Sequence, residues 1–196
     1  MGVRSYFIQY KFILPDTIKH SSYTYQKLFR ALYGYTQAVY KSNGKVYHYH
    51  RNGVLSDTPF LRPGKNCVII PTPALQKLVD FFKTGRNPTH RWKGKGDWKA
   101  VYYMNEKDVD EKKIAEAITA LLNRFQISGV SDKPLSLMEA AEYLSSQGAT
   151  KGKGDLNEIL IAQAKPIVDS DWFKAAAPVS KELKGFYSSY KNLREN

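Results

Sequence analysis

Tyrosine, lysine and arginine recur between residues 35 and 51 in a pattern that suits contact with nucleic acid. Two runs of alternating side chains, residues 35–41 and 45–51, flank Ser42-Asn43-Gly44. Asn-Gly between such runs predicts a β-hairpin, because both residues tolerate a positive φ. Alternation then places eight side chains on one face: Tyr35, Gln37, Val39, Lys41, Lys45, Tyr47, Tyr49 and Arg51. Val46, His48 and His50 fall on the other face.

A face of this composition could bind a nucleic-acid strand without reading its sequence. Tyrosine rings offer surfaces on which bases stack, worth roughly 1–3 kcal/mol each, while lysine and arginine contact phosphates. A two-stranded ribbon also fits the major groove of DNA. The alternative is that Tyr47 and Tyr49 are half-buried sheet aromatics, since tyrosine favours strands.

A second candidate is the long basic loop at residues 84–97. Glycines at positions 94 and 96 would let its backbone approach a ligand closely. Its cations could contact phosphate and its tryptophan could stack on a base, although a plain surface loop is the alternative. The predicted nucleic-acid-binding residues are therefore Lys41, Lys45, Tyr47, Tyr49, Arg51, Arg86, Arg91, Trp92, Lys93 and Lys95.

A nuclease is the alternative function. His48 and His50 share a strand face, with His90 further along the chain, and paired imidazoles could act as acid and base in RNA cleavage or bind a metal. Asp97 and Lys99 lie at the predicted start of a strand, downstream of the acidic residue at position 80.

The second set is weakly similar to the Asp…(Asp/Glu)-x-Lys core of metal-dependent nucleases, but Asp80 falls in a predicted helix. A two-metal site also needs several converging carboxylates. Residues 1–104 hold only four acids, which are Asp16, Asp57, Asp80 and Asp97. We therefore expect binding rather than catalysis, with no metal ion and no cofactor.

The distribution of charge supports this ranking. The chain of 196 residues has a net charge of +12 and a pI near 9.6. Residues 1–104 carry 17 Lys/Arg against the four acids, whereas residues 105–196 carry 13 Lys/Arg and 14 Asp/Glu. Eleven of the 14 tyrosines precede residue 105. A segment so poor in acid repels itself unless a polyanion neutralises it, although charge that serves only solubility is the alternative.

The elements that must position these residues follow from periodicity and turn signals. We expect strands at Val3–Leu14 (central, because both faces are apolar), at the hairpin, at Asn66–Pro71 and at Trp98–Met104. We expect helices at Ser21–Tyr33, capped by Ser21 or Ser22, and from Thr72-Pro73 to Lys83, capped by Thr72. The C-terminal helices are expected at 108–125, 136–146 (opened by a capping box of Ser136 and Glu139), 155–165 (stopped by Pro166), 171–176 and 178–192.

Residues 135–144, Leu-Ser-Leu-Met-Glu-Ala-Ala-Glu-Tyr-Leu, resemble the opening helix of helix-turn-helix proteins of the excisionase and MerR kind. Their pattern runs Leu-Thr-x-x-Glu-Ala-Ala-x-x-Leu. The resemblance implies that the next helix reads DNA. That helix instead carries Asp155 and Glu158, where a reading helix should be basic.

The predicted fold is α+β: a mostly antiparallel sheet with two packed helices in residues 1–104, and an all-helical part in residues 105–196 that packs on the first. The single cysteine, Cys67, allows no internal disulfide, and no apolar run reaches the ~18–20 residues of a membrane span. We expect an intracellular, cytoplasmic or nucleoid-associated protein that binds DNA or RNA. A genome-coating nucleoprotein is a further alternative, with the helical half as the contact for a second copy or a protein partner.

Overall fold

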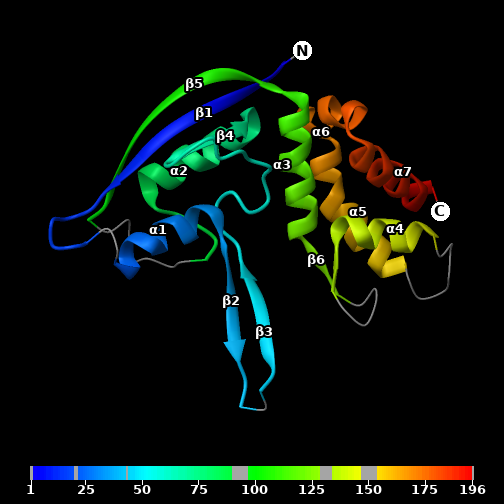
Figure 1. Cartoon of the computed structure of the whole chain (residues 1–196), viewed down its shortest axis with the longest axis horizontal. Coiled ribbons are helices and arrows are strands. Elements are labelled where there is room, and N and C mark those ends of the chain that lie inside the picture. The colour runs from blue at the N-terminus through cyan, green and yellow to red at the C-terminus, as the bar shows by residue number, and fades with distance from the viewer. Residues whose placement is uncertain are drawn as a thin grey trace. The chain divides into compact units, whose positions relative to one another are not determined.

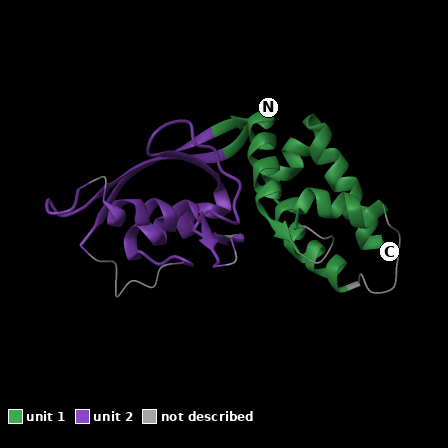
Figure 2. Ribbon diagram, turned by 60° about the horizontal axis from the view of Figure 1, so that its bottom comes forward, with its two compact units in different colours: residues 1–4, 108–196 green, residues 5–107 purple. Residues whose placement is uncertain are grey.

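The computed structural model describes residues 2–19, 22–42, 44–89, 97–128, 134–146 and 154–195, with the backbone alone for Tyr47 and His48. These residues form antiparallel sheets and a helical C-terminal region, which confirms the predicted α+β class (Figure 1). The chain divides into two compact units (Figure 2): unit 2 is residues 5–107, and unit 1 is residues 1–4 with residues 108–196. Among the described helices, none is long and apolar enough to cross a membrane.

Unit 2 is built on a three-stranded sheet. Its order is β4 (Cys67–Pro71), β1 (Gly2–Ile13), β5 (Lys99–Asp110), so β1 is central, as predicted. β1 and β4 are antiparallel, from Ser5 opposite Pro71 to Gln9 opposite Cys67. Figure 1 shows helices α1 (Tyr23–Tyr33) and α2 (Leu75–Thr84) beneath β1 and β5.

The core of unit 2 lies between this sheet and the two helices. The even-numbered side chains Ile8, Tyr10 and Phe12 of β1 are buried, together with apolar side chains of α1 and α2. On the odd face of β1, Gln9, Lys11 and Ile13 are exposed, so the apolar composition of both faces is not the reason that this strand is central. The odd face is therefore open from Gln9 to Ile13, whereas Ser5 and, on β4, Ile69 are buried on that face.

Local signals set the ends of α1 but not the start of α2. Ser22 caps α1 by accepting a hydrogen bond from the Tyr25 amide (3.3 Å), and Gly34 ends it with φ +76°. The prediction that Thr72 caps the next helix is wrong. The chain leaves β4 directly into the 3₁₀ turn η1 (Thr72–Ala74), so Thr72 is itself helical and Pro71 occupies the cap position without a side-chain bond.

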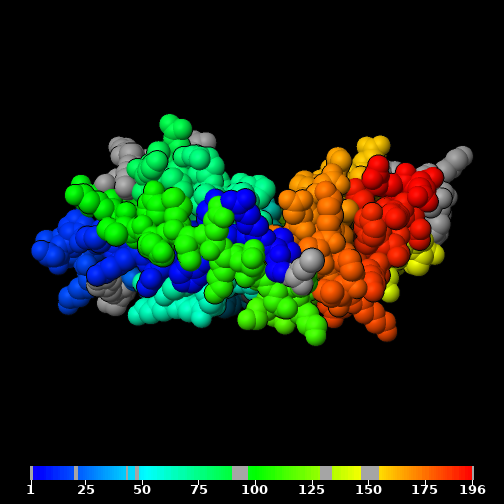
Figure 3. All heavy atoms as spheres, turned by 90° about the horizontal axis from the view of Figure 1, so that it is seen from above, coloured from blue at the N-terminus to red at the C-terminus, as the bar shows by residue number. Residues whose placement is uncertain are grey.

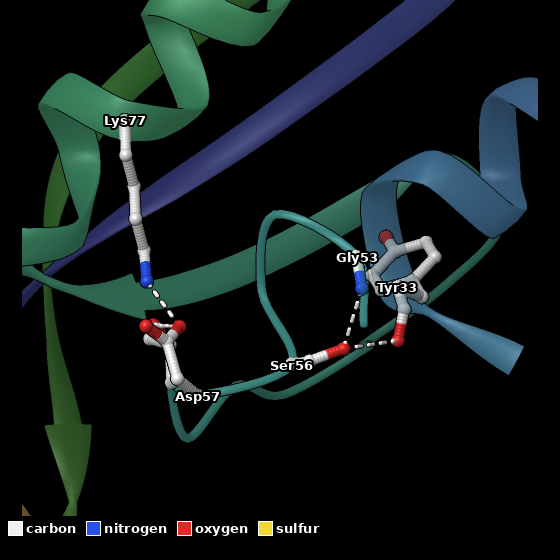
Figure 4. Close-up of polar contacts among 6 residues, drawn as sticks. Tyr33, Gly53, Ser56, Asp57 and Lys77 are labelled. Atoms are coloured by element: carbon white, nitrogen blue, oxygen red, sulfur yellow. Dashed lines mark hydrogen bonds and ion pairs between the residues drawn. The ribbon is translucent and has the colours of Figure 1, made fainter. Parts of the chain in front are cut away.

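The hairpin of β2 (Tyr35–Tyr40) and β3 (Val46–Arg51) projects from unit 2 beyond the end of α1 (Figure 1). Its base is held against α1 by two backbone hydrogen bonds, from the amide of Val54 to the carbonyl of Ala31 and from Leu55 to Leu32, both 2.9 Å. The segment from Gly53 to Ser56 is held by the Ser56 hydroxyl, whose Oγ accepts a hydrogen bond from the Gly53 amide at 2.7 Å (Figure 4).

β5 is longer than the sequence predicts. It continues to Asp110, whereas Trp98–Met104 was the expected range, and α3 (Glu111–Arg124) therefore begins after residue 108. The polar segment 105–110 is extended because β5 lies beside β1 in the sheet. Asp110 then caps α3 by accepting from the amides of Lys112 and Lys113.

The rest of unit 1 is mainly helical. After α3 come the two-residue strands β6 (Gln126–Ile127) and β7 (Leu135–Ser136), then α4 (Leu137–Ser146), α5 (Gly154–Val168), α6 (Asp171–Ala176), the 3₁₀ turn η2 (Ala177–Val179) and α7 (Lys181–Glu195). α7 packs on α4, and α6 packs on α3. Trp172 of α6 and Tyr190 of α7 are almost fully buried.

The structure confirms the capping box of unit 1 and corrects two helix ends. The Ser136 amide donates to Glu139 Oε2 at 2.8 Å, and the Glu139 amide donates to Ser136 Oγ at 3.2 Å. Pro166 does not stop α5, which continues to Val168; the proline lacks one amide donor, and the helix ends two residues later. The last helix begins at Lys181 rather than residue 178, since Pro178 belongs to η2.

Candidate nucleic-acid interface

The register of the hairpin confirms which of its residues share a face. Tyr35 lies opposite Arg51, Gln37 opposite Tyr49 and Val39 opposite residue 47. Directly opposed residues of an antiparallel pair project to the same side. The predicted face therefore exists as a backbone arrangement, and the turn is closed by a bond from the Lys41 amide to the Lys45 carbonyl (2.9 Å).

The hairpin is exposed to solvent on both faces. None of its described side chains is buried, and Tyr49 is 44% and Tyr40 79% exposed. These two tyrosines project to opposite faces, since Tyr40 pairs with Val46. Core packing therefore does not account for Tyr40 and Tyr49, because an isolated ribbon buries little apolar surface.

Cation–π contacts connect the base of the hairpin to α1. The Arg30 guanidinium lies 4.9 Å from the ring centre of Tyr35 and 5.6 Å from that of Tyr23. Along β3, Arg51 lies 5.9 Å from the ring centre of Tyr49, and across the ribbon its Nε donates to Gln37 Oε1 at 3.3 Å. We call these residues the arginine–tyrosine strip: Tyr23, Arg30, Tyr35, Gln37, Tyr49 and Arg51.

The strip lies in a segment without acidic residues. Residues 17–56 contain six Lys/Arg and no Asp or Glu. The next acid, Asp57, is paired with Lys77 at 2.5 Å (Figure 4). Within the described part of the chain, neither Arg30 nor Arg51 forms an ion pair with a carboxylate. Both guanidinium groups therefore keep N–H donors for an anion.

The structure places some of the predicted binding residues and not others. Lys41, Lys45 and Arg51 are exposed on the hairpin, and Arg86 is exposed just after α2. His90, Arg91, Trp92, Lys93 and Lys95 lie outside the described residues, as do the side chains of Tyr47 and His48. The binding role of the basic loop at residues 84–97 thus stays a prediction.

The sequence did not indicate Tyr23 or Arg30. Each lies on α1, and the contact with Tyr35 depends on the sharp turn at Gly34. The available signal was the acid-free segment 17–56, which includes α1 as well as the hairpin.

The candidate catalytic residues are not assembled by the described residues. His50 is exposed on the face away from the strip, opposite Thr36. Asp97 and Lys99 are exposed at the start of β5, and Asp80 is on α2, where its carboxylate accepts from Gln76 Nε2 at 2.9 Å. The described residues contain no group of three or more His, Cys, Asp or Glu that could hold a metal ion.

One buried tyrosine pair has a structural explanation. The hydroxyls of Tyr10 and Tyr33 are 2.8 Å apart and join β1 to the end of α1. Burial raises the pKa of both hydroxyls. For Tyr10, the neighbouring Tyr33 raises the pKa as well. Arg62 covers the Tyr33 ring at 4.6 Å. Both hydroxyls stay protonated at neutral pH and serve to position α1.

In unit 1, α4 and α5 correspond to the two helices of the resemblance to helix-turn-helix proteins. α5 presents exposed Asp155 and Glu158, an unsuitable surface for the DNA backbone.

Comparison with family models, with curated proteins and with solved structures gives no match.

Proposed function

We propose that this protein binds nucleic acid through the arginine–tyrosine strip and the hairpin that carries it. The observation that supports the proposal most is an exposed ribbon with cationic and aromatic side chains in a 40-residue segment, residues 17–56, that has no carboxylate. Such a surface attracts a polyanion and offers rings for stacking.

The contacts of the strip also favour an anion with flat groups. An arginine that stacks on a ring keeps its edge N–H groups, which bind phosphate in pairs. Arg30 is held between two rings, so it loses little side-chain freedom when it binds. Lys41 and Lys45 add charge at the tip. A ribbon exposed on both faces suits a groove as well as a strand.

The test is a binding panel with single- and double-stranded DNA and RNA at two salt concentrations. The double variant Arg30→Gln/Arg51→Gln should bind roughly ten-fold more weakly or worse, and its log–log salt slope should fall by about two, because two phosphate contacts are lost. The matched control is Lys112→Gln/Lys184→Gln in unit 1, which changes the net charge equally at two exposed lysines.

Three results would count against the proposal: no binding to any nucleic acid at low salt, an affinity that does not depend on salt, or an equal loss in the control. Incubating the same panel with Mg²⁺ or with EDTA tests the nuclease alternative. Cleavage that disappears in His50→Ala would favour catalysis over binding alone.

A further inference from the structure

The sheet of unit 2 has a face that the described helices of this unit leave open. α1 and α2 pack on the even-numbered side chains of β1, and the odd-numbered side chains project to the other side. Large apolar groups there are exposed: Tyr103 by 64%, Val101 by 58% and Ile13 by 43%. Figure 3 shows atoms of β1 (blue) and β5 (green) on the viewed surface.

This open face is basic and free of acids along both strands. Its cations are Lys11, Lys99 and Lys107, all exposed. Lys107 Nζ lies 5.7 Å from the ring centre of Phe7, so the two side chains meet on this face. The one acid of β5 within unit 2, Glu106, is even-numbered and accepts from the Tyr6 hydroxyl at 3.2 Å.

The other acids of β5, Asp108 and Asp110, are also even-numbered and belong to unit 1. Asp16 follows the end of β1 and Asp97 precedes the start of β5. Because the strands are antiparallel, both acids belong to the same end of the sheet. Along β1 and β5 within unit 2, the charged side chains of this face are therefore all lysines, with Phe7 and Tyr103 among them.

Charge and shape together select one occupant. Three lysines without an acid match a polyanion, and two aromatic rings on a flat sheet match unstacked bases. A duplex hides its bases inside, so it cannot stack them on a flat face. A second copy of the chain would place lysine against lysine, which opposes face-to-face pairing.

We propose that this face, defined by Phe7, Lys11, Lys99, Tyr103 and Lys107, binds single-stranded nucleic acid. Bases stack on Phe7 and Tyr103, and the three lysines contact phosphates. The inference deepens the proposed function and rests on it, since it names single strands as the ligand and adds a second surface on unit 2.

The full chain is tested with fluorescein-labelled 12-nucleotide oligouridylate and oligothymidylate, and with RNA and DNA duplexes of equal length. Tyr103→Ala should weaken single-strand binding roughly ten-fold, the loss of one stacked base. Duplex binding should not change. Tyr103→Phe keeps the ring and should bind as wild type does, and Tyr143→Ala on α4 is the control for loss of an exposed tyrosine.

A photo-cross-link provides a second readout that does not depend on the variants. Oligonucleotides with 5-iodouracil should cross-link to wild type at a peptide containing Phe7 or Tyr103, identified by mass spectrometry. Comparison of the RNA and DNA oligonucleotides shows which of the two single-stranded nucleic acids this face prefers. Because Tyr103 is largely exposed, Tyr103→Ala should melt at the wild-type temperature.

The outcomes separate this inference from the proposed function. If Arg30→Gln/Arg51→Gln loses affinity while Tyr103→Ala binds single strands as wild type does, the open face is not a binding surface and the strip remains. If no oligonucleotide binds wild type, both proposals fail. If wild type sediments as a dimer that Tyr103→Ala dissociates, the face pairs with a second copy and this inference is overturned.

Discussion

Gly53, at the base of the hairpin, should tolerate a side chain poorly. A Cβ at this position would overlap the backbone nitrogen of Gly34 and lie 2.8 Å from both the carbonyl carbon and the oxygen of Leu32. All three atoms belong to the backbone, so no change of rotamer relieves the overlap. To accommodate the Cβ, the segment after β3 and the end of α1 must move apart.

The cost follows from these contacts. Overpacking in a tight site costs about 1–3 kcal/mol, and an obstruction by backbone belongs at the upper end of that range. Separation also weakens the bonds from Val54 to Ala31 and from Leu55 to Leu32, each worth about 1 kcal/mol. Alanine recovers about 0.4–1 kcal/mol by restricting the unfolded chain. We expect Gly53→Ala to lower the free energy of unfolding by about 3–4 kcal/mol.

Urea unfolding monitored by circular dichroism measures this loss, and two glycines of unit 2 serve as controls. Gly44 has φ +75° but no neighbour within 4 Å, so Gly44→Ala should cost only the left-handed strain, about 1–2 kcal/mol. Gly64 has neither feature, and Gly64→Ala should stay within about 0.5 kcal/mol of wild type. Hydrogen exchange at the Val54 and Leu55 amides assigns the loss to unit 2. A Gly53→Ala protein as stable as Gly64→Ala would refute the reasoning.

Two further predictions concern unit 1. Hydrogen bonds from Ser136, chiefly from its backbone amide, hold the pKa of Glu139 below its ordinary value. The stabilisation by Glu139 is therefore present at pH values above the ordinary pKa, and it is lost as the pH falls through the lowered pKa. The difference in urea stability between wild type and Glu139→Gln should therefore shrink as the pH is lowered from 7 through the acidic range; a constant difference contradicts this cause. Gly185 is exposed within α7 with no atom near its missing Cβ, so Gly185→Ala should raise the free energy of unfolding by about 0.5–1 kcal/mol, measured in the same titration. A loss of stability would mean that the helix is constrained there.

The sequence predicted the elements that local chemistry controls. The serine cap of α1, the Asn-Gly turn of the hairpin and the Ser136–Glu139 capping box each act over three or four residues. The alternation in the hairpin also predicted which residues are opposite one another, because the turn fixes the register. These parts of the candidate site required no knowledge of the rest of the chain.

The features that sequence reasoning missed depend on distant contacts. The polar residues 105–110 have no strand pattern of their own, and they are extended because β5 lies beside β1, about 100 residues earlier. Apolar residues on both faces of β1 did not indicate which face the helices cover, because that depends on the packing of α1 and α2. Arg30 meets Tyr35 only because the chain changes direction at Gly34.

The division of the chain has a consequence for the order in which the protein is completed during synthesis. Unit 2 is one continuous segment, residues 5–107, while unit 1 needs residues 1–4 as well as residues 108–196. Residues 1–4 leave the ribosome before residues 108–196, the rest of unit 1, have been synthesised. Unit 2 is thus an insertion within unit 1. It can fold first, and its two ends enter adjacent strands, as the ends of an inserted domain must.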